Sequence, residues 1–269
     1  MSSIPLLFNE TNLSHAWARA LLQVIDHSGT EISPLVISVT GFQNGEPFED
    51  ASVRGALDVA LVHKGEQSVN TVANTIFPYS LWRRSQYERQ EFYQRYINIL
   101  PRAKALEGSK NRRGLYFERL IAFGEGPHDG NQLEHIILEH QGRSGVRKSM
   151  FQASIFDPKR DHTRAAQIPF PCLQHVSFVP SAQEMTLTLN AFYATQQLFN
   201  KAYGNYLGLC RLGAFMAREM GLTFTRMNCF IGVEKLEKIT KKSAILDPVI
   251  QAARAALLVE ADSREPVMK

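Results

Sequence analysis

The sequence contains few cysteines, and nothing in their spacing pairs them. Only three are present, Cys172, Cys210 and Cys229, and they match neither a disulfide framework nor a cysteine-based zinc site. His135 and His140 are five positions apart, which places them on different faces of a helix. We therefore assign no metal site. A chain without structural disulfides suits a reducing compartment, so we expect a cytoplasmic protein.

Long hydrophobic runs and a large excess of one charge are also lacking. No stretch has the ~20 apolar residues of a membrane-spanning helix, and residues 1–11 lack the basic start and apolar run of a signal peptide. We therefore expect no membrane partner. The net charge is only +4, with 30 basic and 26 acidic residues. This balance suits an anionic small molecule as well as nucleic acid and does not decide between them. We expect a nucleotide-like small molecule as the ligand rather than nucleic acid.

The remaining composition is that of one globular domain, which we place over residues 1–269. Hydrophobic residues make up 44% of the chain and charged residues 21%, enough apolar material for a substantial core. Periodicity predicts helices and strands in roughly equal number. The predicted helices cover residues 12–26, 68–77, 81–100, 131–141, 206–220 and 245–258, and the predicted strands cover 35–41, 146–156 and 222–231.

A cysteine precedes the clearest β-hairpin of the sequence. Met185, Leu187 and Leu189 alternate with polar residues, which is typical of a half-buried strand, and Val176 belongs to its predicted hairpin partner. Cys172 comes just before this pair, after a Pro-Phe-Pro turn. The pattern therefore places Cys172 at the mouth of a sheet, either as a reactive thiol or as a small packed residue. Arg147, Lys148 and His175 are the candidate cations that could lower the pKa of its thiol.

The order of these features resembles the thymidylate synthase family. A Pro-Cys172 hairpin is followed by Gly204-Asn205 and a long apolar helix, and it is preceded by an amphipathic helix and the Arg147-Lys148 pair. The similarity covers residues 110–240. It implies an α/β fold with a large mixed sheet, helices packed on one side, and the other sheet face buried in a symmetric homodimer.

The same resemblance implies a function for a group of side chains. Cys172 would add to an electron-poor pyrimidine ring of a nucleotide or nucleoside, and C5 of that ring would accept a one-carbon unit from methylenetetrahydrofolate. Arg147 and Lys148 would hold the phosphate across the dimer. On a regular strand these two neighbours point to opposite faces, so both could serve one site only at an irregular strand end. The further substrate-binding residues implied are Asn205, which would read the base, Gln197 and Tyr116.

Other positions depart from the family pattern. The proton-managing glutamate corresponds to Asn74, which cannot act as a general acid or base. The phosphate-binding arginine corresponds to Ala194, and the sugar-binding histidine and tyrosine correspond to Lys235 and Glu237. These departures keep an alternative open: a catalytically inactive protein of this fold that binds nucleotides or serves as a structural subunit. A third hypothesis is nucleic-acid binding through the aromatic and basic stretch 81–100.

Overall fold

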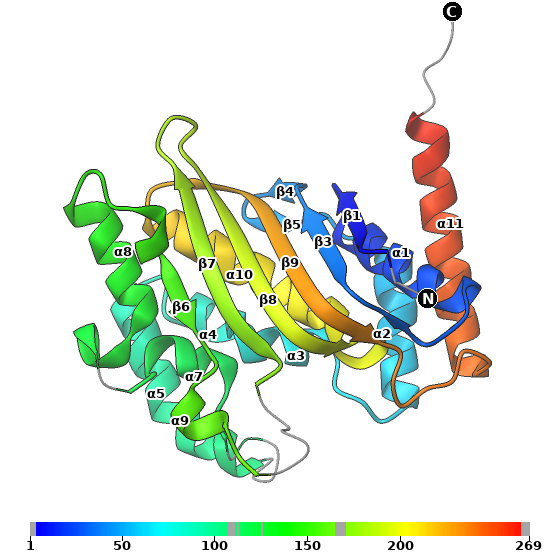
Figure 1. Ribbon diagram of the computed structural model, residues 1–269, viewed down its shortest axis with the longest axis horizontal. Coiled ribbons are helices and arrows are strands. Elements are labelled where there is room, and N and C mark those ends of the chain that lie inside the picture. The colour runs from blue at the N-terminus through cyan, green and yellow to red at the C-terminus, as the bar shows by residue number, and fades with distance from the viewer. Residues whose placement is uncertain (1–3, 107–110, 112, 125, 165–170, 265–269) are drawn as a thin grey trace, which may run out of the picture.

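The computed structural model describes residues 4–106, 111, 113–124, 126–164 and 171–264. It is a mixed α/β structure built on one large sheet with the strand order β1-β3-β9-β8-β7-β6, while β2 pairs with β9 at one end (Figure 1). A separate small hairpin joins β4 to β5. The strands are β1 (Leu6–Glu10), β2 (Glu31–Ile32), β3 (Leu35–Val39), β4 (Phe42–Gln43), β5 (Glu46–Pro47), β6 (Gln152–Ser154), β7 (Leu173–Ser181), β8 (Thr186–Gln197) and β9 (Thr223–Lys235).

The sheet contains both parallel and antiparallel ladders. β8 runs parallel to β9 and β1 parallel to β3, whereas β3–β9, β7–β8 and β6–β7 are antiparallel. The predicted hairpin is confirmed, because Val176 faces Ala191 across the β7–β8 ladder. Alternate side chains of β8 and β9, such as Leu189 and Cys229, are fully buried. The predicted large mixed sheet is therefore correct.

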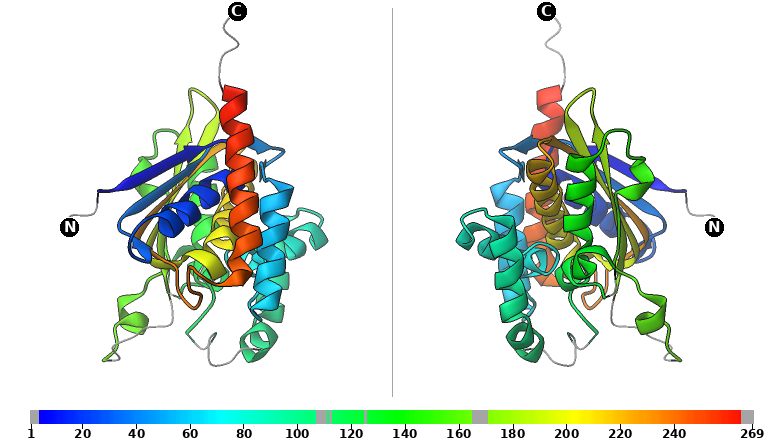
Figure 2. Two further views of the ribbon diagram at one scale, coloured as in Figure 1. Left: turned by 90° about the vertical axis from the view of Figure 1, so that its right-hand side faces the viewer. Right: turned by 90° about the vertical axis from the view of Figure 1, so that its left-hand side faces the viewer.

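Helices cover one face of this sheet. α10 packs behind β8 and β9, and α1 and α11 lie side by side toward the β1 end (Figures 1 and 2). Gly204 and Gly208 let α10 approach α3 closely, because a Cβ at Gly204 would meet the Val72 Cβ at 2.6 Å. The helices are α1 (Leu13–Asp26), α2 (Ala51–His63), α3 (Val69–Ile76), α4 (Tyr79–Arg84), α5 (Arg89–Leu106), α7 (Tyr116–Ile121), α8 (Gln132–Gly142), α9 (Pro158–Asp161), α10 (Tyr203–Glu219) and α11 (Asp247–Arg264).

The opposite face of the sheet is open among the described residues. Phe192 and Phe230 lie on adjacent strands of this face, stack with ring centroids 5.5 Å apart, and are 41% and 40% exposed. Asn190 and Asn228 continue the same face with a hydrogen bond of 2.9 Å. No helix in the described part of the chain is long and apolar enough to cross a membrane.

Several element boundaries differ from the sequence-based predictions. The stretch 81–100 is two helices, because Gln86 and Tyr87 adopt positive φ angles between them. The predicted strand 146–156 is reduced to β6, and Lys148 starts the short 3-10 turn η2 (Lys148–Met150). Helix α2, capped by Asp50, was not predicted, because its apolar residues are spread around the helix.

Asparagine caps two of the helices. Asn12 caps α1, and Asn131 caps α8. In both cases an asparagine side chain accepts a hydrogen bond from a backbone N–H of the first helical turn, the usual role of this residue type at a helix start. The Pro169-Phe170 part of the predicted turn before Cys172 lies outside the described residues.

Candidate functional site

Cys172 lies immediately before β7, at the sheet end where β8 and β9 finish. Its carbonyl oxygen accepts a hydrogen bond of 3.2 Å from Ala194 N–H of β8, and its own N–H donates to the Tyr116 hydroxyl at 3.4 Å. The residue is partly exposed, whereas Cys210 and Cys229 are buried. Of the three thiols, Cys172 is therefore the one placed to meet a ligand.

The groups around Cys172 both raise and lower the pKa of its thiol. Burial raises the pKa of the thiol, and the nearby Glu237 carboxylate raises it further, while a hydrogen bond with Tyr116 and the Lys201 ammonium lower it. The balance is a raised pKa, so the free protein holds a protonated thiol near neutral pH. A ligand that moves Glu237 away would shift this balance toward the thiolate.

Lys201 and Glu237 are two charged residues that the sequence analysis did not assign to the thiol. Lys201 Nζ donates to Gln67 Oε1 at 2.8 Å, and Gln197 Nε2 donates to Glu237 Oε2 at 3.1 Å. Gln197, which was predicted as a substrate-binding residue, thus lies in the same group and holds the acidic residue beside Cys172. Both charged residues stand in turns after strands, where no sequence period marks them.

Beneath this group lies a set of buried polar side chains without partners. Tyr193, Gln196, Asn200 and Glu234 are all buried. Six of their oxygen and nitrogen atoms have no hydrogen-bond partner in the described chain: Tyr193 Oη, both amide atoms of Gln196 and of Asn200, and Glu234 Oε1. We call these four residues the buried polar cluster. Each such atom costs about 1–3 kcal/mol unless water or a ligand satisfies it.

The strands themselves bring this cluster to the helix side of the sheet. Along β8 every second residue is buried as far as Tyr193, and the next buried residue, Gln196, comes three positions later. β9 makes the same step from Ile231 to Glu234, and Gln196 faces Glu234 in the ladder. Regular alternation would direct these two side chains to the open face. Both strands thus shift their alternation by one residue at the same level of the ladder, and for this reason the period-2 pattern did not reveal Gln196 and Glu234.

Glu234 is the only acidic residue of the buried polar cluster. It is fully buried, and its Oε2 accepts a hydrogen bond of 3.1 Å from the Tyr206 hydroxyl. Burial raises its pKa to about 8, although the Tyr206 hydrogen bond opposes the shift. Tyr193 links it to the thiol, since the Tyr193 pKa is raised by burial and also by Tyr116, Cys172 and Glu234. Glu234 can therefore hold a proton near neutral pH within the buried polar cluster.

A buried ion pair fixes α7, the helix that begins at Tyr116. Arg119, one turn along α7, contacts both carboxylate oxygens of Asp161 at 2.9 Å, and the two side chains are 1% and 0% exposed. Arg119 also donates to the carbonyl oxygens of Ile155 and Arg113. This network joins α7 to α9 and to the end of β6, and so it fixes the helix that presents Tyr116 to Cys172.

The predicted cations Arg147, Lys148 and His175 do not lie beside Cys172 of the same chain. Arg147 and Lys148 are exposed and precede β6, whereas Cys172 lies beyond the other end of that strand in the antiparallel β6–β7 ladder. His175 Nε2–H donates a 2.8 Å hydrogen bond to Gln152 Oε1, and burial lowers the pKa of the imidazole, so His175 is not a cation at neutral pH.

Asn205 and Asn74 occupy different environments. Asn205 lies in the first turn of α10 and is 5% exposed, and its side chain makes no hydrogen bond to the described residues. It stands at the same end of the sheet as Cys172, because α10 follows β8 through the turn η3 (Leu198–Ala202). The Asn74 amide oxygen accepts a hydrogen bond from Tyr79 N–H at 3.2 Å, which is a structural role at the α3–α4 junction.

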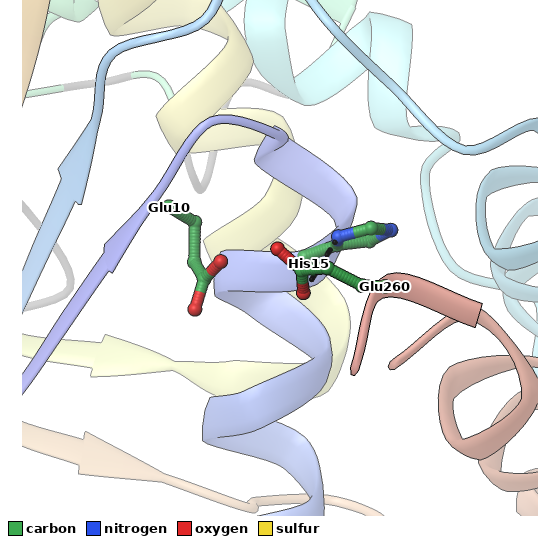
Figure 3. Close-up of side chains that lie close together, drawn as sticks. All are labelled: Glu10, His15 and Glu260. Atoms are coloured by element: carbon green, nitrogen blue, oxygen red, sulfur yellow. Dashed lines mark ion pairs between the residues drawn. The ribbon is translucent and has the colours of Figure 1, made fainter. Parts of the chain in front are cut away.

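A second group of titratable side chains lies between α1 and α11. Glu10, His15 and Glu260 place their ligand atoms within 4.8 Å of one another (Figure 3). The Arg19 guanidinium contacts the Glu10 carboxylate and lies 3.3 Å from that of Glu260. A cation of the protein itself thus bridges the two acidic residues, and we interpret the group as an ion-pair network that fastens α11 to α1.

Comparisons with known proteins add no relative: no protein-family model matches the chain, and no curated protein matches it.

Proposed function

We propose that this protein is a divergent thymidylate synthase-like protein that acts on a pyrimidine-like nucleoside or nucleotide through addition of Cys172 to the ring. One observation carries the proposal: a partly exposed thiol lies beside the Tyr116 hydroxyl and above the buried polar cluster. Amides and a protonated carboxyl are the groups that recognise the carbonyl and N–H edge of a pyrimidine. Their missing partners indicate that a polar ligand or ordered water completes the site.

The proposed step uses the residues of this site. The Cys172 thiol passes its proton to the neighbouring Glu237 carboxylate as its sulfur forms a bond to C6 of the ring, and the electron pair of the C5–C6 double bond moves toward C5 and the C4 carbonyl oxygen. That oxygen takes the proton held by Glu234, which becomes a carboxylate. Reversal returns both protons and releases the thiol. Glu234 would thus supply the acid–base function that Asn74 cannot.

The ligand's charge is the point on which the site departs most from the resembled family. Among the described residues, the Lys201 ammonium lowers the pKa of the thiol and the Glu237 carboxylate raises it. A dianionic phosphate would meet this carboxylate, so an uncharged nucleoside suits the site of one chain better than a nucleotide. Arg147 and Lys148 would add positive charge only from a second copy.

A one-carbon donor and a dimer belong to the same proposal. Three cavities of about 570, 480 and 380 Å³ are lined by described residues other than those around Cys172, and we route no step through methylenetetrahydrofolate. The stacked, half-exposed Phe192 and Phe230 on the open sheet face support its burial against a second copy.

The raised pKa of Cys172 favours one alternative. A thiol that stays protonated near neutral pH is a poor nucleophile, which is what a nucleotide-binding or structural protein with this fold and no activity would have. The two functions differ in whether a covalent bond forms.

Covalent trapping separates them. The protein is incubated with 5-fluorodeoxyuridine, its 5′-monophosphate and the 5-fluorocytosine analogues, with and without methylenetetrahydrofolate, and its intact mass is measured. The proposal predicts a one-ligand adduct on the wild type, none on Cys172→Ser, and retention of the adduct on the control Cys210→Ala. Equal affinity of wild type and Cys172→Ser by calorimetry, with no adduct, would establish the binding protein instead. Light scattering of the same sample tests for a mass of twice 30.3 kDa.

A further inference from the structure

The largest of the three cavities lies at the other end of α10 from Cys172. It has a volume of about 570 Å³, within the usual range for small-molecule sites of ~300–1,000 Å³. Its walls come from the C-terminal half of α10, from α4, and from the start of β9 with the β4–β5 hairpin. We call it the arginine cavity. Its main lining residues are Phe42, Glu46, Tyr79, Trp82, Arg211 and Arg218.

Two arginines of one helix face stand in this cavity, each stacked on an aromatic ring. Arg211 lies over Tyr79 with its Cζ 4.8 Å from the ring centroid. Arg218, two turns along α10, lies 5.4 Å from the Trp82 centroid and 4.8 Å from that of Tyr87. Stacking engages the flat face of a guanidinium and leaves its N–H edge available for a carboxylate or phosphate.

The hydrogen-bonding capacity of these arginines is little used by the protein. Arg211 reaches Glu46 and Asn70 only at 3.4 Å, the long end of the range. Arg218 is exposed and forms no ion pair with a described carboxylate. The cavity therefore holds two oriented cations against one acidic residue, which favours an anionic ligand.

The backbone beside the cavity adopts a conformation that its residues disfavour. Gln86 and Tyr87 both have positive φ angles, 52° and 62°, although neither is a glycine or asparagine. This turn sets the Tyr87 ring against Arg218 and edge-on to Trp82, with centroids 5.5 Å apart. Unfavourable backbone geometry of this kind is concentrated at ligand sites, and here it builds the aromatic wall.

We propose that the arginine cavity binds a small molecule made of a planar aromatic ring that carries a phosphate or carboxylate. The ring packs among the aromatic side chains from α4 and β9, and the anion meets the free N–H edges of Arg211 and Arg218. Glu46 keeps Arg211 aligned. This ligand site is separate from the Cys172 site and does not depend on any reaction there.

Trp82 provides a direct readout, because the chain has only two tryptophans. In a Trp17→Phe background, Trp82 is the only tryptophan of the chain. Phenyl phosphate is titrated into this protein while the Trp82 fluorescence is recorded. We expect a saturable change, with phenol and inorganic phosphate each binding at least about tenfold more weakly, since each supplies only half of the contacts. Benzoate distinguishes a carboxylate from a phosphate ligand.

Four variants test the assignment. Arg211→Ala and Arg218→Ala should each weaken phenyl phosphate binding about tenfold or more, the size expected for a lost charged hydrogen bond. Arg83→Ala, an exposed arginine of α4 that does not line the cavity, should leave binding unchanged. Tyr87→Asn should weaken binding without lowering the melting temperature, since asparagine tolerates positive φ. Circular dichroism checks that each variant is folded.

Three results would overturn the proposal. One is a non-saturating fluorescence change, and another is equal binding by wild type, Arg211→Ala and Arg218→Ala. The third is tighter binding of a short single-stranded oligonucleotide that Arg83→Ala weakens as much as Arg218→Ala, which would assign the surface to nucleic acid. Cys172→Ser is expected to bind phenyl phosphate normally, so failure of the proposed chemistry at Cys172 leaves this result interpretable.

Discussion

The polar side chains near the two ends of α10 are in opposite environments. At the N-terminal end, the buried polar cluster places amides and a carboxyl out of water without partners. At the C-terminal end, Arg211 and Arg218 stay partly in solvent and rest on aromatic rings. Burying the unpaired groups lowers the free energy of unfolding unless a ligand or water hydrogen-bonds to them. Stacking orients Arg211 and Arg218 without a comparable cost. Burial of unpaired groups and pre-orientation of exposed ones are thus two ways to prepare a site in one fold.

The largest effect is expected from the ion pair that holds the Cys172 end in place. Arg119→Ala leaves the Asp161 carboxylate buried without its bidentate partner, and such losses cost about 3–5 kcal/mol. Urea unfolding should therefore show the free energy of unfolding reduced by this amount. The change should also alter the rate at which iodoacetamide modifies Cys172, because Tyr116 shares α7 with Arg119.

A double variant serves as the control for this prediction. Arg119→Met combined with Asp161→Leu removes both charges and should recover most of the lost stability, as apolar replacements of buried pairs often do. If Arg119→Ala alone costs less than about 1 kcal/mol, the range of an exposed pair, the pair is not buried in solution as described.

The next effect concerns Glu234 and depends on pH. Its pKa in the folded protein, about 8, lies above the ordinary value of 4.5, so the folded state binds this proton more tightly than the unfolded state. The contribution is fully present below about pH 4.5 and is lost as the pH rises through 8. This loss amounts to roughly 5 kcal/mol in total, at ~1.4 kcal/mol per pH unit.

Glu234→Gln should remove that dependence. The variant would be more stable than the wild type at pH 8 and similar to it near pH 5, while adduct formation at Cys172 falls because the amide has no proton to give. Unfolding curves in urea between pH 5 and pH 8.5 measure the effect, with the exposed Glu184→Gln as control. Parallel pH profiles for Glu234→Gln and wild type would contradict a buried protonated Glu234.

The smallest effect tests how closely α10 packs at the Cys172 end. Gly204→Ala would place a methyl group 2.6 Å from Val72 Cβ and 2.8 Å from the Val69 carbonyl oxygen, and such overpacking costs about 1–3 kcal/mol. Thermal unfolding measures the loss. Gly55→Ala is the matched control, since nothing lies within 4 Å of its added methyl and α2 should gain up to ~1 kcal/mol. Phenyl phosphate binding at the arginine cavity should be unaffected by Gly204→Ala.

Periodicity predicted the parts of the fold whose side chains follow one regular repeat. The β7–β8 hairpin and α10 were identified because apolar residues recur at the spacing that each element requires. Gly221 follows α10 with a φ of 71°, the left-handed conformation typical of a residue that ends a helix. Helix α2 was missed because its apolar residues are spread around the helix, with Val59 and Val62 exposed. The resemblance to thymidylate synthases stays a prediction.

The candidate site was harder to predict than the fold, for a physical reason. Cys172, Gln197 and Tyr116 were predicted as site residues, and that role stays a prediction; in the structure Tyr116 contacts Cys172, and Gln197 contacts Glu237. Lys201 and Glu237 stand in turns without periodicity. Glu234 and Gln196 reach the helix side only through the matched shift in β8 and β9, and a shift in strand phase leaves no mark in composition.

The position of β9 governs the order in which the molecule can assemble. β9 is hydrogen-bonded to β3 on one side and to β8 on the other, yet it emerges from the ribosome long after β3. Until then, the two halves of the nascent sheet carry exposed edges that can pair with other chains. We therefore expect slow, largely post-translational folding and a need for chaperones at high expression, since long-range strand pairing delays folding and exposes intermediates to aggregation.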